Sequence, residues 1–196
     1  MRNFAFIFAR GGSKGLPGKN IKELVGKPLL QYSIDTALAI DEIEKVFVST
    51  DDVDIANCAK QCGAIVIDRP AELATDQSPE WLSWRHAIDW VTEQYGQFDG
   101  FVSLPATRPL RSVEDVQNAI HARQQQQADD SITITPASRS PYFNIVKYNE
   151  QGFVELVNKP QGEVARRQDA PQVFDITTTV YASTPEFILN HYGLFS

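Results

Sequence analysis

The loop at residues 10–20 contains the residue types that could bind a polyphosphate. It follows an apolar run at residues 4–9 and reads RGGSKGLPGKN, with four glycines among two lysines and an arginine. Glycines let the backbone approach a ligand and turn its N–H groups inward, while the cations supply the charge that phosphates need. Residues 2–27 hold six lysines and arginines against one acid, in a chain of formal net charge −7. The sequence therefore predicts a nucleoside triphosphate cradle at the carboxyl end of the first strand.

Two known phosphate-binding motifs do not fit this loop. A Walker A loop needs G-x-x-x-x-G-K-[ST], but Ser13 stands where its first glycine belongs, and Asn20 follows Gly18-Lys19 where Ser or Thr should hold magnesium. The G-x-G-x-x-G spacing of dinucleotide sites is also absent from the sequence. The alternative is a flexible, solvated surface loop. The concentration of positive charge in an acidic chain argues against that alternative.

The elements that must position this loop are predicted from hydrophobic periodicity. Strands are expected at 4–9, 45–50, 64–67 and 101–104. Helices are expected at 28–38 with Pro28 as the first residue, at 53–62 ending before Gly63, and from residue 79 onwards. This order predicts a mostly parallel sheet with helices on both faces. Because ligands of such sheets bind beyond the carboxyl ends of the strands, the loops 10–20, 50–52, 68–78 and 104–111 should converge.

The second half of the chain is predicted to be richer in strands. Ser112 should cap a polar helix that extends through Gln127. Residues 131–135 and 175–181 read as strands, and 142–148 and 152–157 read as a hairpin around Asn149-Glu150-Gln151-Gly152. With 196 residues and 42% hydrophobic content, the chain is expected to form one domain, 1–196, around one core.

Several blocks of the sequence together resemble the acylneuraminate cytidylyltransferase family, also called CMP-nonulosonic acid synthetases. The blocks cover nearly the whole chain in order: ARGGSKGLPGKN, VSTD at 48–51, RPAELATD at 69–76, LPATRPLR at 104–111 and Arg167-Gln168. The resemblance implies a three-layer α/β/α, Rossmann-like nucleotide-diphosphosugar transferase fold with a projecting hairpin at about 140–160. It also implies transfer of CMP from CTP to the anomeric hydroxyl of an acidic nonulosonic sugar, with release of pyrophosphate.

The first block, Arg69 of the third block and Ser78 just after that block supply the candidate nucleotide-binding residues. Arg10 and Lys19 are the candidate catalytic residues, because they can neutralise charge on the phosphates. The full set of candidate nucleotide-binding residues is Arg10, Gly11, Gly12, Ser13, Lys14, Lys19, Asn20, Arg69 and Ser78. Two of these have structural alternatives. Arg69 could form a surface ion pair, and Ser78, which precedes Pro79, could be a helix N-cap.

The later blocks supply the candidate sugar-binding residues, which are Thr107, Arg108, Arg167, Gln168 and Tyr181. The family commonly has glutamine where this chain has Pro105, and serine where it has Arg108, so the acceptor remains open among sialic, legionaminic and pseudaminic acids. Arg108 could pair with a sugar carboxylate, a geometry that arginine favours. Tyr181 could instead be a core aromatic residue with a satisfied hydroxyl.

The resemblance also implies a cofactor and binding partners. Magnesium is expected, but the family's Asp-x-Asp ligands lie beyond the end of this chain, and Asp51, Asp76 and Asp175 are not at matching positions. The metal ligands are therefore unknown, and a truncated, non-catalytic nucleotide-binding protein is one rival. A related sugar nucleotidyltransferase with another sugar or base is a second. A homodimer binding CTP and an acidic sugar is expected.

Composition narrows the partners further. The acidic balance argues against nucleic acid and anionic membranes as partners. No apolar run approaches the roughly 20 residues of a transmembrane helix, and the N-terminus lacks the pattern of a signal peptide. Cys58 and Cys62 have no nearby histidine and are predicted to be semi-buried thiols rather than zinc ligands. Together these features predict a cytoplasmic protein.

Overall fold

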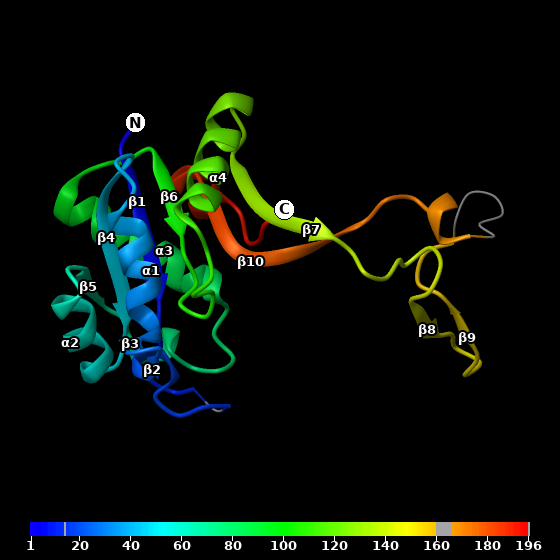
Figure 1. Ribbon diagram of the computed structural model, residues 1–196, viewed down its shortest axis with the longest axis horizontal. Helices are drawn as coiled ribbons and strands as arrows, with labels where there is room; N and C mark the ends of the chain where they lie inside the picture. Colours follow the sequence, from blue (N-terminus) through cyan, green and yellow to red (C-terminus); the bar gives the residue numbers. More distant parts are fainter. Residues whose placement is uncertain (14, 160–165, 196) are drawn as a thin grey trace. The chain divides into compact units, whose positions relative to one another are not determined.

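The computed structural model describes residues 1–13, 15–159 and 166–195, which form two compact units. The first unit comprises Met1–Thr133 and Thr178–Ser196, and the second comprises Ile134–Thr177. Figure 1 shows the elements of both units.

A six-stranded, mostly parallel sheet with the order β5-β4-β1-β6-β10-β7 forms the centre of the first unit. Strand β1 (Asn3–Phe8) lies between β4 (Ile43–Thr50) and β6 (Gly100–Ser103) and is parallel to both. Strand β5 (Ile65–Asp68) pairs in parallel with β4, whereas β10 (Phe174–Ser183) runs antiparallel to β6. The outer strand β7 is Asp130–Pro136. The strand predicted at residues 4–9 is confirmed, and it lies inside the sheet.

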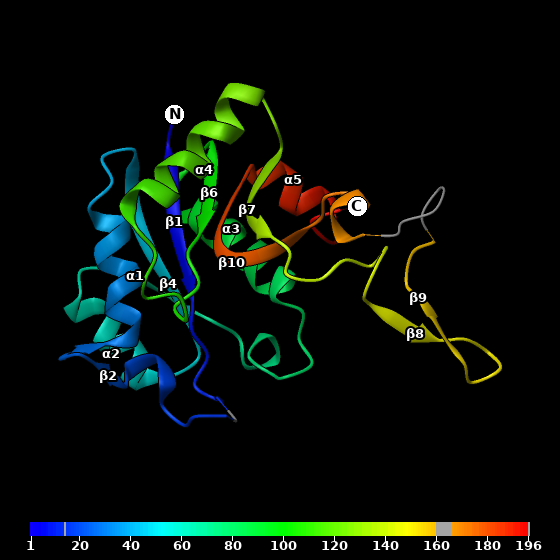
Figure 2. The same cartoon turned by 45° about the vertical axis from the view of Figure 1, so that its right-hand side comes forward.

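Helices cover both faces of this sheet, as Figures 1 and 2 show. Successive residues of a strand point to opposite faces, so Ala5 and Ile7 pack with α1 (Leu29–Leu38), α2 (Val53–Gln61) and α4 (Val113–Gln126). Phe4 and Phe6 pack on the other face with α3 (Glu80–Tyr95) and α5 (Pro185–Asn190). The predicted α/β/α layering is confirmed.

Most predicted helix boundaries agree with the structure to within two residues. Ser112 and Asp115 form a reciprocal capping box at the start of α4. Gly63, with a φ of +88°, follows the end of α2. The prediction for Pro28 was wrong by one position. Pro28 occupies the N-cap of α1 and ends β3 (Lys27–Pro28), which forms a short hairpin with β2 (Glu23–Leu24).

The second unit contains the predicted hairpin, with shorter strands than expected. Strand β8 (Val146–Tyr148) pairs antiparallel with β9 (Val154–Leu156). At their turn the Asn149 side-chain oxygen accepts hydrogen bonds from the backbone N–H groups of Gln151 and Phe153. A short 3-10 helix, η3 (Arg167–Asp169), follows later in the unit. No helix among the described residues is long and apolar enough to cross a membrane.

Candidate functional site

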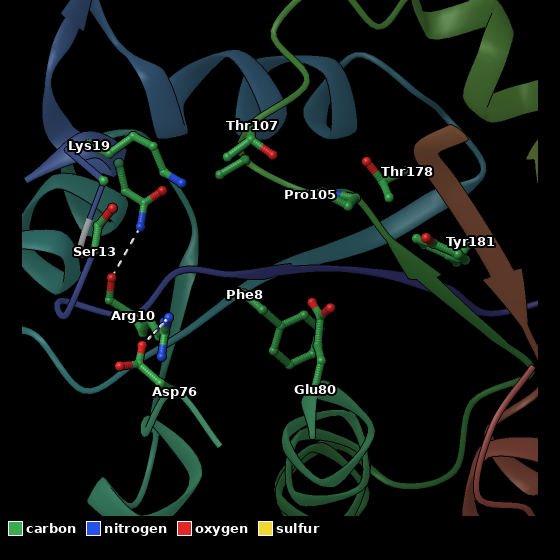
Figure 3. Close-up of a pocket in the computed structure, with 13 residues that line it drawn as sticks. Phe8, Arg10, Ser13, Lys19, Asp76, Glu80, Pro105, Thr107, Thr178 and Tyr181 are labelled. Carbon is green, nitrogen blue, oxygen red and sulfur yellow. Dashed lines mark hydrogen bonds and ion pairs between the residues drawn. The ribbon is translucent and has the colours of Figure 1, made fainter. Parts of the chain in front are cut away.

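A cavity of about 470 Å³ opens at the carboxyl ends of β1 and β6 in the first unit (Figure 3). The predicted residues that line it are Arg10, Ser13, Lys19, Asn20, Thr107 and Tyr181. Sequence reasoning did not assign a site role to its other lining residues, which include Phe8, Asp76, Glu80, Pro105 and Thr178. The loops after separate strands therefore do converge, and they place cations, hydroxyl groups and an aromatic ring around one space.

The glycine loop after β1 is held by the loop after β4. The Gly11 N–H donates to the Asp51 side chain over 3.0 Å, and the Asn20 side chain donates to the Arg10 carbonyl oxygen over 3.2 Å. A Cβ atom on Gly11 would lie 2.5 Å from a carboxylate oxygen of Asp52, so any side chain there would force Asp52 to shift. Gly12 is exposed and has open space where a Cβ would be. Lys14 lies outside the described residues.

Arg10 and Lys19 supply positive charge to the cavity. The Arg10 guanidinium forms an ion pair with Asp76 at 2.6 Å, and the guanidinium also donates to the Ala74 carbonyl oxygen at 3.5 Å. Lys19 begins the short 3-10 helix η1 (Lys19–Ile21), which brings its side chain to the cavity wall. The two predicted phosphate-binding cations thus share one site, and Asp76 balances one of them.

A smaller compartment of about 240 Å³ shares Phe8, Arg10, Asp76 and Glu80 with the larger cavity. Its further polar residues include Arg69 and Ser78. Arg69 is 8% exposed, donates twice to Ser49 at 3.1 and 2.6 Å, and places its guanidinium carbon 5.5 Å from the Phe8 ring centroid. Burial lowers its pKa, although nearby Asp51 and Glu80 raise it. The surface ion-pair interpretation of Arg69 was therefore wrong.

Ser78 does not cap the helix that follows it. Helix α3 begins at Glu80 with Pro79 in the N-cap position and no side-chain cap, so the capping interpretation was wrong. The Ser78 hydroxyl oxygen is buried, has no hydrogen-bond partner among the described residues, and lines the smaller compartment. A buried hydroxyl without a partner can bind a ligand at little desolvation cost, because it has already lost its contact with water.

Glu80 and Tyr181 face the cavity from two different elements. Figure 3 shows the Glu80 carboxylate at the start of α3 beside the Phe8 ring. Desolvation raises the pKa of Glu80, whereas the Trp84 indole and the Arg69 charge lower it. Desolvation also raises the pKa of Tyr181, with a further contribution from Glu80. Tyr181 lies 5.6 Å from Trp84 between ring centroids, so its ring packs against the core, and its side chain also lines the cavity. Its contact with a sugar stays a prediction.

The loop after β6 is fixed by a buried arginine. Arg111 donates to the carbonyl oxygens of Pro105 and Thr179 at 2.8 and 2.7 Å and to the Ser33 hydroxyl at 3.1 Å. Burial lowers its pKa to about 10. Its neighbour Arg108 is exposed and donates to the hydroxyl oxygen of Thr178, a residue of the cavity wall, at 2.9 Å. Arg111 therefore holds the loop, and Arg108 remains accessible.

Arg167 and Gln168 belong to the second unit. There they line a separate cavity of about 250 Å³ together with Arg139 and Ser140, and Arg167 donates to the Ala137 carbonyl oxygen at 3.2 Å.

Cys58 and Cys62 are free and half-buried, as predicted, and desolvation raises the pKa of Cys62 to about 11. Within the described ranges, no group of three or more His, Cys, Asp or Glu side chains could hold a metal ion.

Comparison with known proteins gives one family. Residues 4–194 match the model of the family described as cytidylyltransferase. The chain is 34% identical over 191 residues to post-translational flagellin modification protein B of Campylobacter coli, covering 96% of this chain and 80% of that protein. It is 31% identical, with the same coverage, to a CMP-N,N'-diacetyllegionaminic acid synthase of Campylobacter jejuni.

A solved structure supports the same fold. The chain resembles a CMP:2-keto-3-deoxy-manno-octonic acid synthetase, solved in complex with CTP, with a TM-score of 0.71 and 20% identity. The match covers 97% of this chain and 77% of that one. At this level of identity the likeness concerns the fold alone.

The close approach at Gly11 predicts unequal effects of two adjacent alanine substitutions. Gly11→Ala should lower the free energy of unfolding by about 1–3 kcal/mol, because the added methyl group displaces the Asp52 carboxylate, which also caps α2. Gly12→Ala is the matched control and should change it by less than about 0.5 kcal/mol. Urea unfolding followed by circular dichroism would measure both. Equal effects would contradict the close approach.

Proposed function

Because the chain belongs to the cytidylyltransferase family, we propose that it transfers CMP from CTP to the anomeric hydroxyl of an acidic nonulosonic sugar and releases pyrophosphate. One observation carries this proposal. The cationic glycine loop and the hydroxyl-bearing residues Thr107 and Tyr181 line the same cavity. A cavity with phosphate-binding cations on one wall and side-chain hydroxyls that can bind a sugar on another suits a reaction between a triphosphate and a sugar.

The proposed reaction requires that the two substrates are aligned and that the negative charge on the phosphates is stabilised. It does not require a nucleophile from the protein. A sugar hydroxyl attacks the α-phosphorus of CTP and releases its proton to water, while the bond from that phosphorus to the bridging oxygen of pyrophosphate breaks. Lys19 and Arg10 neutralise the phosphate oxygens and the departing pyrophosphate. The Gly12 N–H adds a donor, since the Gly11 and Ser13 N–H groups already bind the Asp51 side chain and the Gly11 carbonyl oxygen. Asn20 holds the Arg10 carbonyl oxygen and thereby keeps the loop in position.

Magnesium belongs to the proposal as an ion that arrives with the triphosphate. Nucleotide sites bind it through one or two carboxylates together with substrate phosphates, and when bound it neutralises phosphate charge. The residues that the structure describes form no metal site on their own, since they contain no cluster of three metal-ligating side chains. No step above depends on the ion.

The acceptor's carboxylate is proposed to bind Arg108. This arginine is exposed beside the cavity and is held by Thr178 through its Nε atom, so its terminal nitrogens can bind a carboxylate in the planar geometry that guanidinium favours. Arg167 and Gln168 are kept as proposed sugar-binding residues from the family resemblance.

A homodimer is also proposed, on the basis of apolar surface in the second unit. Tyr148 and Phe153 are 79% and 69% exposed on the β8–β9 hairpin, and Val146 and Val154 are exposed beside them. A monomeric protein seldom exposes contiguous apolar side chains of this size, so a second copy of the chain is the proposed cover.

The phosphate assignment predicts a large loss of activity on removal of either cation. Lys19→Ala and Arg10→Ala should each lower kcat/KM for CTP by about 100- to 1,000-fold, which is the usual effect of losing a transition-state donor. The assay is pyrophosphate release with CTP, Mg²⁺ and a panel of acidic nonulosonic sugars. Lys22→Ala, an exposed lysine that does not line the cavity, is the matched control. If both cavity variants matched the wild type, the proposed phosphate site would be wrong.

The assignment of Arg108 predicts a selective effect on the sugar. Arg108→Met should raise KM for the acidic sugar by about 10- to 100-fold, because a charge-assisted pair is lost, and should leave KM for CTP unchanged. A sugar whose carboxylate is converted to an amide supplies the comparison. The wild type should bind the amide as poorly as the variant does. An equal loss for the acid and the amide in the variant would argue against this pairing.

The dimer predicts that charged hairpin residues give a monomer. The double variant Tyr148→Asp, Phe153→Asp should sediment at half the mass of the wild type, because a desolvated carboxylate is costly in an apolar interface. Val53→Glu, at an exposed apolar position of the first unit, serves as the control and should leave the mass unchanged. A monomeric wild type at tens of micromolar would refute the dimer.

A further inference from the structure

We propose that Arg111 and Ser33 are positioning residues, which set the separation between the two walls of the larger cavity without touching either substrate. Neither residue belongs to the lining of that cavity. The inference rests on the proposed function and deepens it, because it names the contacts that would hold the two substrates in line for the reaction.

The two walls of the larger cavity come from different parts of the chain. The phosphate wall consists of the glycine loop and η1, and the acceptor wall consists of the loop after β6 and the adjoining part of β10. Figure 3 shows Arg10 and Lys19 on one side and Pro105, Thr178 and Tyr181 on the other. Their separation matters because a misplacement of about 1 Å can slow an aligned reaction by about 100-fold.

Arg111 joins the two segments that make up the acceptor wall. Its guanidinium donates to the carbonyl oxygen of Pro105 at 2.8 Å and to that of Thr179 at 2.7 Å. Pro105 lines the cavity, and Thr179 follows Thr178, which also lines it. The pairing of β10 with β6 reaches Tyr181, so Arg111 grips β10 two residues beyond that point. One side chain therefore fixes the loop and the strand relative to each other.

Ser33 connects the acceptor wall to α1. It is fully buried on that helix, and its hydroxyl oxygen accepts a hydrogen bond from Arg111 at 3.1 Å. The same hydroxyl group donates to the Pro105 carbonyl oxygen at 3.3 Å, and a serine hydroxyl can do both at once. Ser33, Arg111 and the Pro105 carbonyl group thus form one hydrogen-bonded unit, which we call the Ser33–Arg111 clamp.

The first turn of α1 is in turn bonded to the phosphate wall. The N–H group of Leu29, the first residue of α1, donates to the Lys22 carbonyl oxygen at 3.0 Å. The Lys22 N–H group donates to the Lys19 carbonyl oxygen at 3.3 Å. Lys19 is the cation that η1 brings to the cavity. A continuous path through backbone hydrogen bonds, one helix and the Ser33–Arg111 clamp therefore links the two walls.

The burial of Arg111 indicates that the geometry of its contacts matters more than its charge. Arg111 is 7% exposed, and its hydrogen bonds go to two carbonyl oxygens and one hydroxyl group. Among the described residues, no carboxylate lies at ion-pair distance from it. Burying a guanidinium without such a partner is costly. Its rigid fork directs three donors at once, which the single ammonium group of lysine cannot reproduce.

The experiment separates the rate of the chemical step from the affinity for CTP. The variants are Ser33→Ala, Arg111→Lys and the double variant. The single-turnover rate of pyrophosphate release is measured at saturating CTP, Mg²⁺ and the sugar that the wild type uses fastest. Isothermal titration calorimetry measures the Kd for CTP without sugar, and thermal unfolding checks that each variant is folded.

Two further variants are matched controls. Thr36→Val removes a second hydroxyl group from α1, one that donates to the Tyr32 carbonyl oxygen within the same helix. Arg85→Lys changes a second carbonyl-binding arginine, which lies on α3 and donates to two carbonyl oxygens at the C-terminal end of α5. Neither residue lines the cavity, so both variants should keep the wild-type rate.

The clamp variants should slow the chemical step and leave CTP binding unchanged. We expect a loss of about tenfold in rate for Ser33→Ala and about 100-fold for Arg111→Lys, with the Kd for CTP within about twofold of the wild type, because the phosphate wall keeps its own contacts. The double variant should match Arg111→Lys to within about threefold, since the two side chains act through one unit.

Several results would overturn the inference. A folded Ser33→Ala with the wild-type rate would do so, and this variant decides alone if Arg111→Lys does not fold. A loss of CTP affinity as large as the loss of rate would show damage to the phosphate wall itself. Rate losses that multiply in the double variant would show that the two residues act separately.

These results would leave the proposed function standing, because the wild type would still release pyrophosphate. A wild type that binds CTP and releases no pyrophosphate with any acidic sugar of the panel would overturn the proposed function, and this inference with it.

Discussion

Parallel pairing of β1 with both β4 and β6 is the constraint on which the rest of the structure depends. It buries the strand on both faces, which requires the uncharged run at its centre, and it forces helical connections that return the chain to the same edge. As a result the loops after three separate strands open toward one place. The cavity lies where these loops meet, beyond the carboxyl ends of the strands.

Much of this fold was predictable because the pattern of apolar residues along a short segment shows which of its side chains are buried. The alternation of Phe4 and Phe6 with Ala5 and Ile7 gives each face of the sheet its own residues, and the start of α4 is marked by Ser112. The β2–β3 hairpin was missed because strands of two residues are too short to show an alternation of apolar and polar residues. Pro28 was misplaced because its fixed φ angle suits the first residue of a helix and the residue before it equally well.

The site was predictable where function depends on residue type within one loop, and not where it depends on long-range contacts. Glycines and cations at 10–20 indicate a phosphate site by composition. Nothing in the sequence links Arg10 to Asp76 or Arg69 to Glu80, because these neighbours are distant in the chain. Glu80 in particular looks like an ordinary acid in the first turn of a helix. Its place on the cavity wall beside Phe8 and Arg69 appears only in the folded structure.

The ion pair between Arg10 and Asp76 has a consequence for which anions the cavity admits. An incoming anion must exchange places with an internal counter-ion before it gains the full attraction of the guanidinium. A singly charged anion gains little attraction by replacing Asp76 beside Arg10, whereas a chain of phosphates carries enough charge to make the replacement favourable. Under the proposed function, Asp76 therefore competes with small anions for Arg10 and favours a polyanion such as a triphosphate.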